Sequence, residues 1–152
     1  MIRSLTLAVL IALTGCGGAA TSSFAPAPEA AAPTAKTAIR IGTMRGPSNR
    51  AARTLKDALE SSLARQGLAV VKRRDALTLE LVGELAAMNE GNVMTYTWEW
   101  RLSRGGSAVA RPIRGFERVA GSSSDQWSGL TGENATRIAD RVARKVAIAL
   151  QR

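Results

Sequence analysis

The sequence predicts an α+β fold, a two-layer sandwich in which two helices pack on one face of a mostly antiparallel sheet of about five strands. Three observations lead to this prediction. Apolar residues alternate with polar ones through most of residues 77–102, which is the period of half-buried strands. Aliphatic residues recur at helical spacing in residues 50–66 and again in residues 134–150. Helices of this kind must bury one apolar face, and a sheet with one apolar face provides the second layer.

The folded part is expected to begin with a short strand over residues 38–44, where Ile39 and Ile41 alternate with Arg40 and Gly42.

A helix follows over residues 50–66. Ser48 or Asn49 is its expected N-cap, and Gly67 fits the C′ position, where the backbone is left-handed. The apolar face of this helix consists of Ala52, Leu55, Leu59 and Leu63. Residues 68–71 then begin a second short strand.

Two long strands form a hairpin around Asn89-Glu90-Gly91-Asn92. The apolar pattern favours a register in which Met88 pairs with Val93, because a slip by one residue would set leucines against Thr or Glu. The pairs expected in this register are Leu85 with Tyr96, Gly83 with Trp98, Leu81 with Trp100, Leu79 with Leu102 and, on the opposite face, Glu80 with Arg101.

A third antiparallel strand is expected from about Ser107, with Ser107 paired to Leu102. Pro112 favours an edge position for this strand, because proline has no N–H to donate to a second neighbour. Phe116 falls out of phase with the strand, which indicates a bulge at Arg114-Gly115.

A polar loop over residues 121–132 leads to the second helix, for which Asn134 is the expected N-cap. The apolar stripe of this helix consists of Ile138, Val142, Val146, Ala149 and Leu150.

The N-terminus reads as an export signal over residues 1–15, with a charged start at Arg3 and a short apolar run from Leu5 to Leu13. Leu13-Thr14-Gly15-Cys16 resembles the lipobox of bacterial lipoproteins, and the resemblance implies that Cys16 carries acyl chains that hold the protein in membrane lipid. The alternative is a secretory signal cut later, after which Cys16 is lost. Residues 16–37 then form the lipidated end and a linker of Ala, Pro, Ser and Thr, and residues 38–152 form a single domain.

Composition limits the chemistry. The chain contains no His and one Cys, so catalysis by a histidine base and zinc sites built on thiolate or imidazole are not expected, and no cofactor is expected. The net charge of +9 would suggest nucleic acid in a cytosolic protein, but export makes that partner unsuitable. Anionic glycolipid of the envelope is the available acidic partner, and a solvated basic surface without a ligand is the alternative.

Two groups of residues are candidates for catalysis. Glu80, Glu84 and Glu99 share the polar sheet face, where a carboxylate pair could act as acid and base, but salt bridging on a solvated face is favoured. Ser122-Ser123-Ser124 lacks a histidine base, which leaves only a Ser–Lys mechanism. No enzymatic activity is therefore expected.

The expected partner-binding residues lie on an edge strand and on the last helix. The edge carries Arg111, Arg114 and Arg118, where an extended partner could add a strand, although charges on an edge also block such pairing. The helix carries Arg137, Arg141 and Arg144. Trp127, in a polar loop, either plugs the open end of the sandwich or is exposed to a partner, and the plug is favoured.

Residues 83–150 resemble a group of small uncharacterised lipoproteins of alphaproteobacteria. The resemblance rests on Tyr96-Thr97-Trp98-Glu99-Trp100, on Gly115-Phe116-Glu117, and on Asp125-Gln126-Trp127, which departs from the Asp-Pro-Trp of that group at its middle residue. At the level of topology the chain is also similar to the lipopolysaccharide-assembly lipoprotein that plugs the outer-membrane translocon and to lipoproteins that activate peptidoglycan synthases. A shared topology does not determine function.

Together these features predict a non-enzymatic lipoprotein on the periplasmic side of the outer membrane that serves as a binding or accessory subunit of an envelope complex with a protein partner. Gly17, next to Cys16, is not the Asp that resembles an inner-membrane retention signal, which favours the outer membrane. One alternative is an accessory protein for lipopolysaccharide or polysaccharide export that binds anionic glycolipid. Another is an enzyme that acts on envelope glycan.

Overall fold

The structure of the protein is a computed structural model that describes residues 37–121 and 124–151. The predicted signal, the lipobox with Cys16 and the linker up to residue 36 lie outside the described residues, as do Ser122 and Ser123. The described elements are β1 (Ala38–Arg45), α1 (Asn49–Arg65), β2 (Ala69–Val70), β3 (Leu79–Asn89), β4 (Val93–Arg104), β5 (Ser107–Ala108), β6 (Ile113–Ala120) and α2 (Gly132–Leu150).

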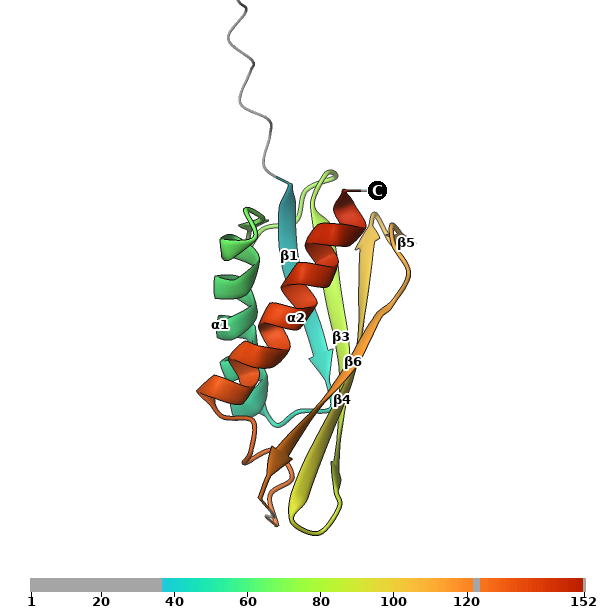
Figure 1. The fold of residues 1–152 in the computed structure, drawn as a ribbon. Helices are drawn as coiled ribbons and strands as arrows, with labels where there is room; N and C mark the ends of the chain where they lie inside the picture. The colour runs from blue at the N-terminus through green and yellow to red at the C-terminus, as the bar shows by residue number, and fades with distance from the viewer. Residues whose placement is uncertain (1–36, 122–123, 152) are drawn as a thin grey trace, which may run out of the picture. The chain divides into compact units, whose positions relative to one another are not determined.

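The strands form one sheet in the order β2-β1-β3-β4-β5, and β6 pairs with the same side of β4 as β5. β1 is parallel to β2 and β3, whereas β3, β4 and β6 are antiparallel. Both helices lie on one face of the sheet, with α2 crossing it obliquely (Figure 1). The predicted two-layer α+β sandwich is confirmed.

The ends of α1 follow from local sequence. The Ser48 side chain accepts a hydrogen bond from the backbone N–H of Ala51, and this caps the first turn. At the other end Gly67 has φ +76, and its N–H donates to the carbonyl of Ala64. The N–H of Leu68 donates to Leu63, which completes a Schellman motif. The predicted cap at Ser48 and the predicted role of Gly67 are confirmed.

The predicted register of the β3–β4 hairpin is wrong by two residues. Asn89 pairs with Met94, and Gly83 therefore lies opposite Trp100 rather than Trp98. The cause is the turn: the N–H of Glu90 donates to the carbonyl of Val93, so that only two residues form the tip of the hairpin. A shift of two residues leaves every side chain on its predicted face. The predicted pair of Glu80 with Arg101 does not form, because Ser103 lies opposite Glu80.

The third strand is interrupted earlier than predicted. It pairs with β4 as β5, in which Ser107 lies opposite Arg104 rather than Leu102, leaves the sheet over residues 109–112, and returns as β6. No bulge occurs at Arg114-Gly115, where the ladder with β4 is continuous. Phe116 is out of phase because its side chain points to the uncovered face of the sheet and is 59% exposed. β6 is an edge strand, as Pro112 indicates.

Helix α2 begins before its predicted cap. Thr131 is the N-cap residue and makes no side-chain capping hydrogen bond, while Asn134 lies within the first turn. The side-chain amide of Asn134 instead donates to the carbonyl of Gly129 at 2.6 Å, which fixes the preceding loop against the helix.

The core lies between the helices and the sheet. Trp98, Trp100 and Tyr96 of β4 fill its centre, and Trp127 is 8% exposed and stacks on Tyr96 at 5.8 Å between ring centroids. Trp127 therefore lies in the core, as expected of a plug. Burial raises the pKa of the Tyr96 hydroxyl, which lies against the backbone of Gly129.

Neither helix of the described chain is long and apolar enough to span a membrane.

Candidate binding groove between β6 and α2

A groove of about 630 Å³ lies between the edge strand β6 and the C-terminal half of α2. Because Gly115 has no side chain, the indole of Trp98 lies across it and contributes to the floor of the groove. The groove is lined by Thr97, Trp98, Arg114, Gly115, Phe116, Arg141, Arg144 and Lys145. This lining contains four cationic side chains and no carboxylate, but Arg114 is hydrogen-bonded to Glu99 and Arg141 is ion-paired with Glu117, so Arg144 and Lys145 are the cations that suit the groove to an anionic ligand.

The backbone of β6 forms one wall of the groove. In the ladder between β4 and β6, the N–H of Gly121 donates to the carbonyl of Asn92. Because hydrogen-bonded and non-hydrogen-bonded pairs alternate along an antiparallel ladder, Arg114 and Phe116 are at non-hydrogen-bonded positions, and their backbone N–H and carbonyl groups point away from β4. Lys145 donates to the carbonyl of Arg114 at 2.7 Å, and Arg141 donates to the carbonyl of Phe116 at 3.1 Å. Side chains of α2 thus occupy two outward-pointing carbonyls of the edge strand. These contacts favour the interpretation that the charged residues block the addition of a partner strand along residues 114–116.

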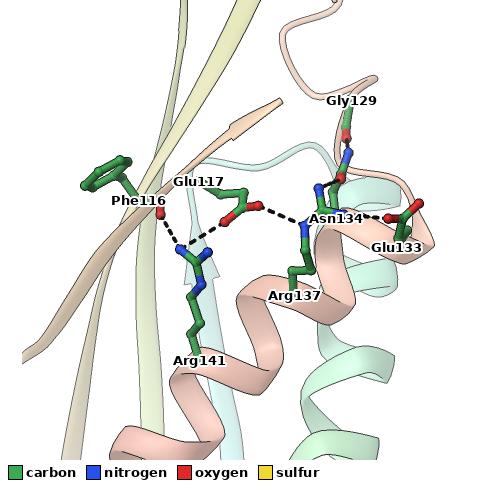
Figure 2. Close-up of polar contacts among 7 residues, drawn as sticks. All are labelled: Phe116, Glu117, Gly129, Glu133, Asn134, Arg137 and Arg141. Carbon is green, nitrogen blue, oxygen red and sulfur yellow. Dashed lines mark hydrogen bonds and ion pairs between the residues drawn. The ribbon is translucent and has the colours of Figure 1, made fainter. Parts of the chain in front are cut away.

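Glu117 holds β6 to the N-terminal half of α2 (Figure 2). Its side chain points towards the helices and is 8% exposed. Arg137 donates to one carboxylate oxygen at 2.9 Å, and Arg141 lies 3.0 Å from the other. Arg137 also contacts Glu133 and Asn134. The hydrogen bond from Arg137 to Glu117 raises the pKa of the Arg137 guanidinium above its ordinary value.

The carboxylates of the outer sheet face, which the sequence offers as candidate catalysts, are ion-paired. Glu80 contacts Arg40 and lies 3.8 Å from Arg74. Glu99 accepts hydrogen bonds from Arg114 at 2.6 Å and from Arg101 at 2.9 Å, and these bonds, in that order, lower the pKa of Glu99.

Glu84 lies opposite Glu99 in the sheet, and its carboxylate is 3.9 Å from Arg45. These carboxylates thus serve as partners of arginines in salt bridges on the outer sheet face. Within residues 37–121 and 124–151, no three His, Cys, Asp or Glu side chains gather as a metal ligand set would require.

Only some of the arginines that were predicted to bind a partner lie at the groove. Arg114, Arg141 and Arg144 line the groove. Arg137 is bound by Glu117, and Arg118 lies 3.7 Å from Glu90 at the other end of β6.

Arg111 lines a second hollow, of about 400 Å³, which shares Lys145 with the groove. Arg144 forms no hydrogen bond and no ion pair within 4 Å among the described residues, so its guanidinium is the groove cation most accessible to a ligand.

Sequence reasoning misses Lys145 and Phe116 as parts of the groove. Lys145 reads as one more charge on a solvated helix face, and nothing local indicates that it reaches β6. Phe116 does carry a signal, because a large apolar residue at an outward position of a strand is unusual, but the sequence pattern alone favours a bulge as its explanation.

Replacing Glu117 is expected to weaken the attachment of α2 to β6. Glu117→Gln should lower the free energy of unfolding by about 1.5 kcal/mol, because a buried carboxylate that accepts a hydrogen bond from Arg137 and is ion-paired with Arg141 loses its charge. Urea denaturation of the variant measures this loss. Glu133→Gln is the matched control, since Glu133 binds the same Arg137 but is 84% exposed, and its effect should be below about 0.5 kcal/mol. Equal effects of the two substitutions would contradict a structural role specific to Glu117.

No family model matches the chain, and no curated protein matches it in sequence. Among solved structures, a minor lipoprotein from Acinetobacter baumannii is similar, with a TM-score of 0.53 and 13% identity over 74% of this chain and 93% of the other. An uncharacterized protein is similar with a TM-score of 0.52 and 13% identity, over 72% and 92% of the two chains. The lipoprotein GNA1162 from Neisseria meningitidis aligns with a TM-score of 0.44 and 12% identity, over 71% and 99%.

The first likeness shows that this domain has a fold that also occurs in a bacterial lipoprotein. At such low identity it shows the fold alone. The resemblance to alphaproteobacterial lipoproteins and to lipopolysaccharide-assembly lipoproteins stays a prediction.

Proposed function

We propose that the protein is a lipid-anchored, non-enzymatic accessory subunit of a bacterial envelope complex and that its groove between β6 and α2 binds an acidic segment of a protein partner. The observation that carries this proposal is the lining of the groove of about 630 Å³, which contains no carboxylate and in which Arg144 and Lys145 are cations without an ion pair within 4 Å among the described residues, beside the paired Arg114 and Arg141. Phe116, which is 59% exposed on the uncovered face of the sheet, lies on the same side of β6 as Arg114 and adds an apolar contact at the rim of the groove. An aromatic anchor next to arginines is typical of residues that contribute most to binding at interfaces.

The anchor is part of the proposal. Leu13-Thr14-Gly15-Cys16 supplies the acylated cysteine, and several acyl chains on one residue give effectively permanent attachment, since each buried methylene contributes about 0.8 kcal/mol. Attachment to the periplasmic side of the outer membrane follows from Gly17 at the position after Cys16. The fold shared with a bacterial lipoprotein is consistent with this location.

A non-enzymatic role is supported by the state of the carboxylates. Glu80 and Glu99 are each paired with two arginines, and the pKa of Glu99 is lowered, whereas a catalytic acid would need a raised pKa. The absence of His from the whole chain removes the commonest general base.

An anionic glycolipid is the second candidate for the groove. The observation in its favour is that Phe116 and Trp98 lie beside Arg114, Arg144 and Lys145, so that phosphate and acyl chain could be bound at neighbouring points.

Photocrosslinking in native membranes tests the groove. A photoreactive amino acid in place of Phe116 should form an adduct, and Arg144→Glu in the same chain should reduce that adduct about tenfold, because one groove cation becomes an anion. Arg53→Glu, on the exposed face of α1, makes the same charge change outside the groove and should leave the adduct unchanged. An adduct that is equally strong with Arg144→Glu would refute binding in the groove. Mass spectrometry of the adduct decides between protein and glycolipid.

The lipid anchor has an independent test. Cells supplied with labelled palmitate should label the wild-type protein and not Cys16→Ala. Equal labelling of the two chains would refute acylation at Cys16.

A further inference from the structure

The end of the domain at which the chain enters the first strand differs from the opposite end. Ile39, Val70, Leu79 and Arg104 lie side by side across the sheet and mark this end. The β2–β3 connection, β5 and the C-terminal end of α2 lie there as well, at the top of Figure 1. We call this end the linker end, because residues 17–37 join it to Cys16.

Cationic side chains dominate the linker end. The exposed cations there are Lys72, Arg73, Arg104 and Arg111, together with Arg74, which lies 3.8 Å from Glu80. The acidic residue of the same connection is Asp75, whose carboxylate accepts hydrogen bonds from the backbone of Leu77 and from Thr78 within its own turn. The linker end therefore presents a surplus of positive charge to solvent.

Exposed apolar side chains accompany these cations. Leu77 is 78% exposed, Ile148 is 46% exposed and Val109 is 41% exposed. Val109 and Ile148 line the same hollow as Arg111 and Lys145. Isolated apolar residues on a surface are ordinary, but three at one end, interleaved with cations, form a surface that is both basic and apolar.

We propose that the linker end is a membrane-facing surface that rests on anionic phospholipid headgroups of the bilayer to which Cys16 is anchored. The cations lie at the level of the lipid phosphates, and Leu77, Val109 and Ile148 enter the boundary with the acyl chains. This proposal rests on the lipid anchor of the proposed function and is independent of the groove.

In sequence, 21 residues lie between Cys16 and Ala38, and a chain of that length spans at most about 70 Å. Contact through the linker end fixes one orientation, in which the tip of the β3–β4 hairpin points away from the bilayer.

Two exposed apolar residues at opposite ends of one strand provide the test. Leu77 precedes β3, and Met88, which is 60% exposed, lies near its other end. The 11 residues of β3 separate them by about 35 Å. Leu77→Cys and Met88→Cys are each labelled with a fluorophore in the full chain. The native Cys16 does not react with the fluorophore, because it is blocked by its acyl chains. Each labelled protein is then reconstituted into vesicles that contain brominated lipids.

Quenching by bromine is expected at position 77 in vesicles that contain phosphatidylglycerol and not at position 88. It should be lost in vesicles of phosphatidylcholine alone. In the phosphatidylglycerol vesicles, Lys72→Glu with Arg73→Glu should reduce quenching at position 77 by roughly fivefold or more. Arg53→Glu with Lys56→Glu, on the exposed face of α1, makes the same change in net charge and should have little effect.

Each other result overturns the proposal. Quenching at both positions or only at position 88 refutes the orientation, and equal quenching with phosphatidylcholine refutes the recognition of anionic lipid. Chains that float with the vesicles but show no quenching at position 77 refute the surface and leave the anchor intact. Chains that do not float with the vesicles refute both the anchor and the surface.

Discussion

Gly46→Ala is expected to lower the free energy of unfolding by at least about 3 kcal/mol. Gly46 follows β1 with φ +102, a conformation that an L-residue rarely adopts. A Cβ atom at this position would lie 1.9 Å from the carbonyl oxygen of Leu85 in the neighbouring strand β3. That oxygen belongs to the backbone of a central strand, so it cannot move without loss of the pairing between β1 and β3.

Gly67→Ala separates the cost of the left-handed backbone conformation from the cost of the clash with Leu85. Gly67 has φ +76, and no atom lies within 4 Å of the position that its Cβ would occupy. The control therefore measures only the cost of a left-handed alanine, about 1 kcal/mol. Urea denaturation of both variants gives the comparison, and a loss at Gly46 no larger than that at Gly67 would show that β1 can shift away from Leu85.

Gly83→Ala is expected to cost about 2–3 kcal/mol through overpacking. Gly83 lies opposite Trp100, and a Cβ atom there would be 2.5 Å from the six-membered ring of the indole. Trp100 is fully buried, so the ring has no free space into which it could rotate. Thermal or urea denaturation measures the change.

A double-mutant cycle identifies the ring as the cause. Trp100→Leu is itself destabilising, but it removes the atoms that the new methyl group at position 83 would meet, and the indole N–H that it deletes has no hydrogen-bond partner in the described structure. In the Trp100→Leu background, Gly83→Ala should cost less than about 0.5 kcal/mol, since alanine is less flexible than glycine in the unfolded chain. An unchanged cost in both backgrounds would place the strain elsewhere.

The elements whose signals are local were predicted most accurately. Ser48 and Gly67 set the ends of α1 through contacts within five residues, and both appear in the sequence as ordinary cap residues. The faces of β3 and β4 were correct because the apolar alternation determines them.

The hairpin register was not determined by that pattern. A shift of two residues keeps the same faces, so only the length of the turn distinguishes the two registers, and the turn at Gly91 is shorter than predicted. The interruption of the third strand over residues 109–112 likewise depends on how the chain leaves the sheet.

The candidate site could be predicted only in part. Arg114, Arg141 and Arg144 were expected to face a partner, and the structure brings them together with Lys145 in one groove. Arg137 was expected there too, but it does not line the groove, and Glu117, which lies 20 residues away in the chain, binds it as well as Arg141. Contacts between a strand and a distant helix have no local periodicity, so no sequence pattern shows which of these arginines Glu117 holds.

The contacts of Lys145 and Arg141 with the carbonyls of β6 affect how copies of the protein can lie next to one another on a crowded membrane surface. Proteins attached to one bilayer are confined to two dimensions, where neighbours meet often and open strand edges would pair between chains. Along Arg114 and Phe116 a neighbour would meet charged donors from α2 that already occupy the outward carbonyls. If the protein is anchored as proposed, this edge can therefore lie beside copies of itself at high surface density without extending into a shared sheet.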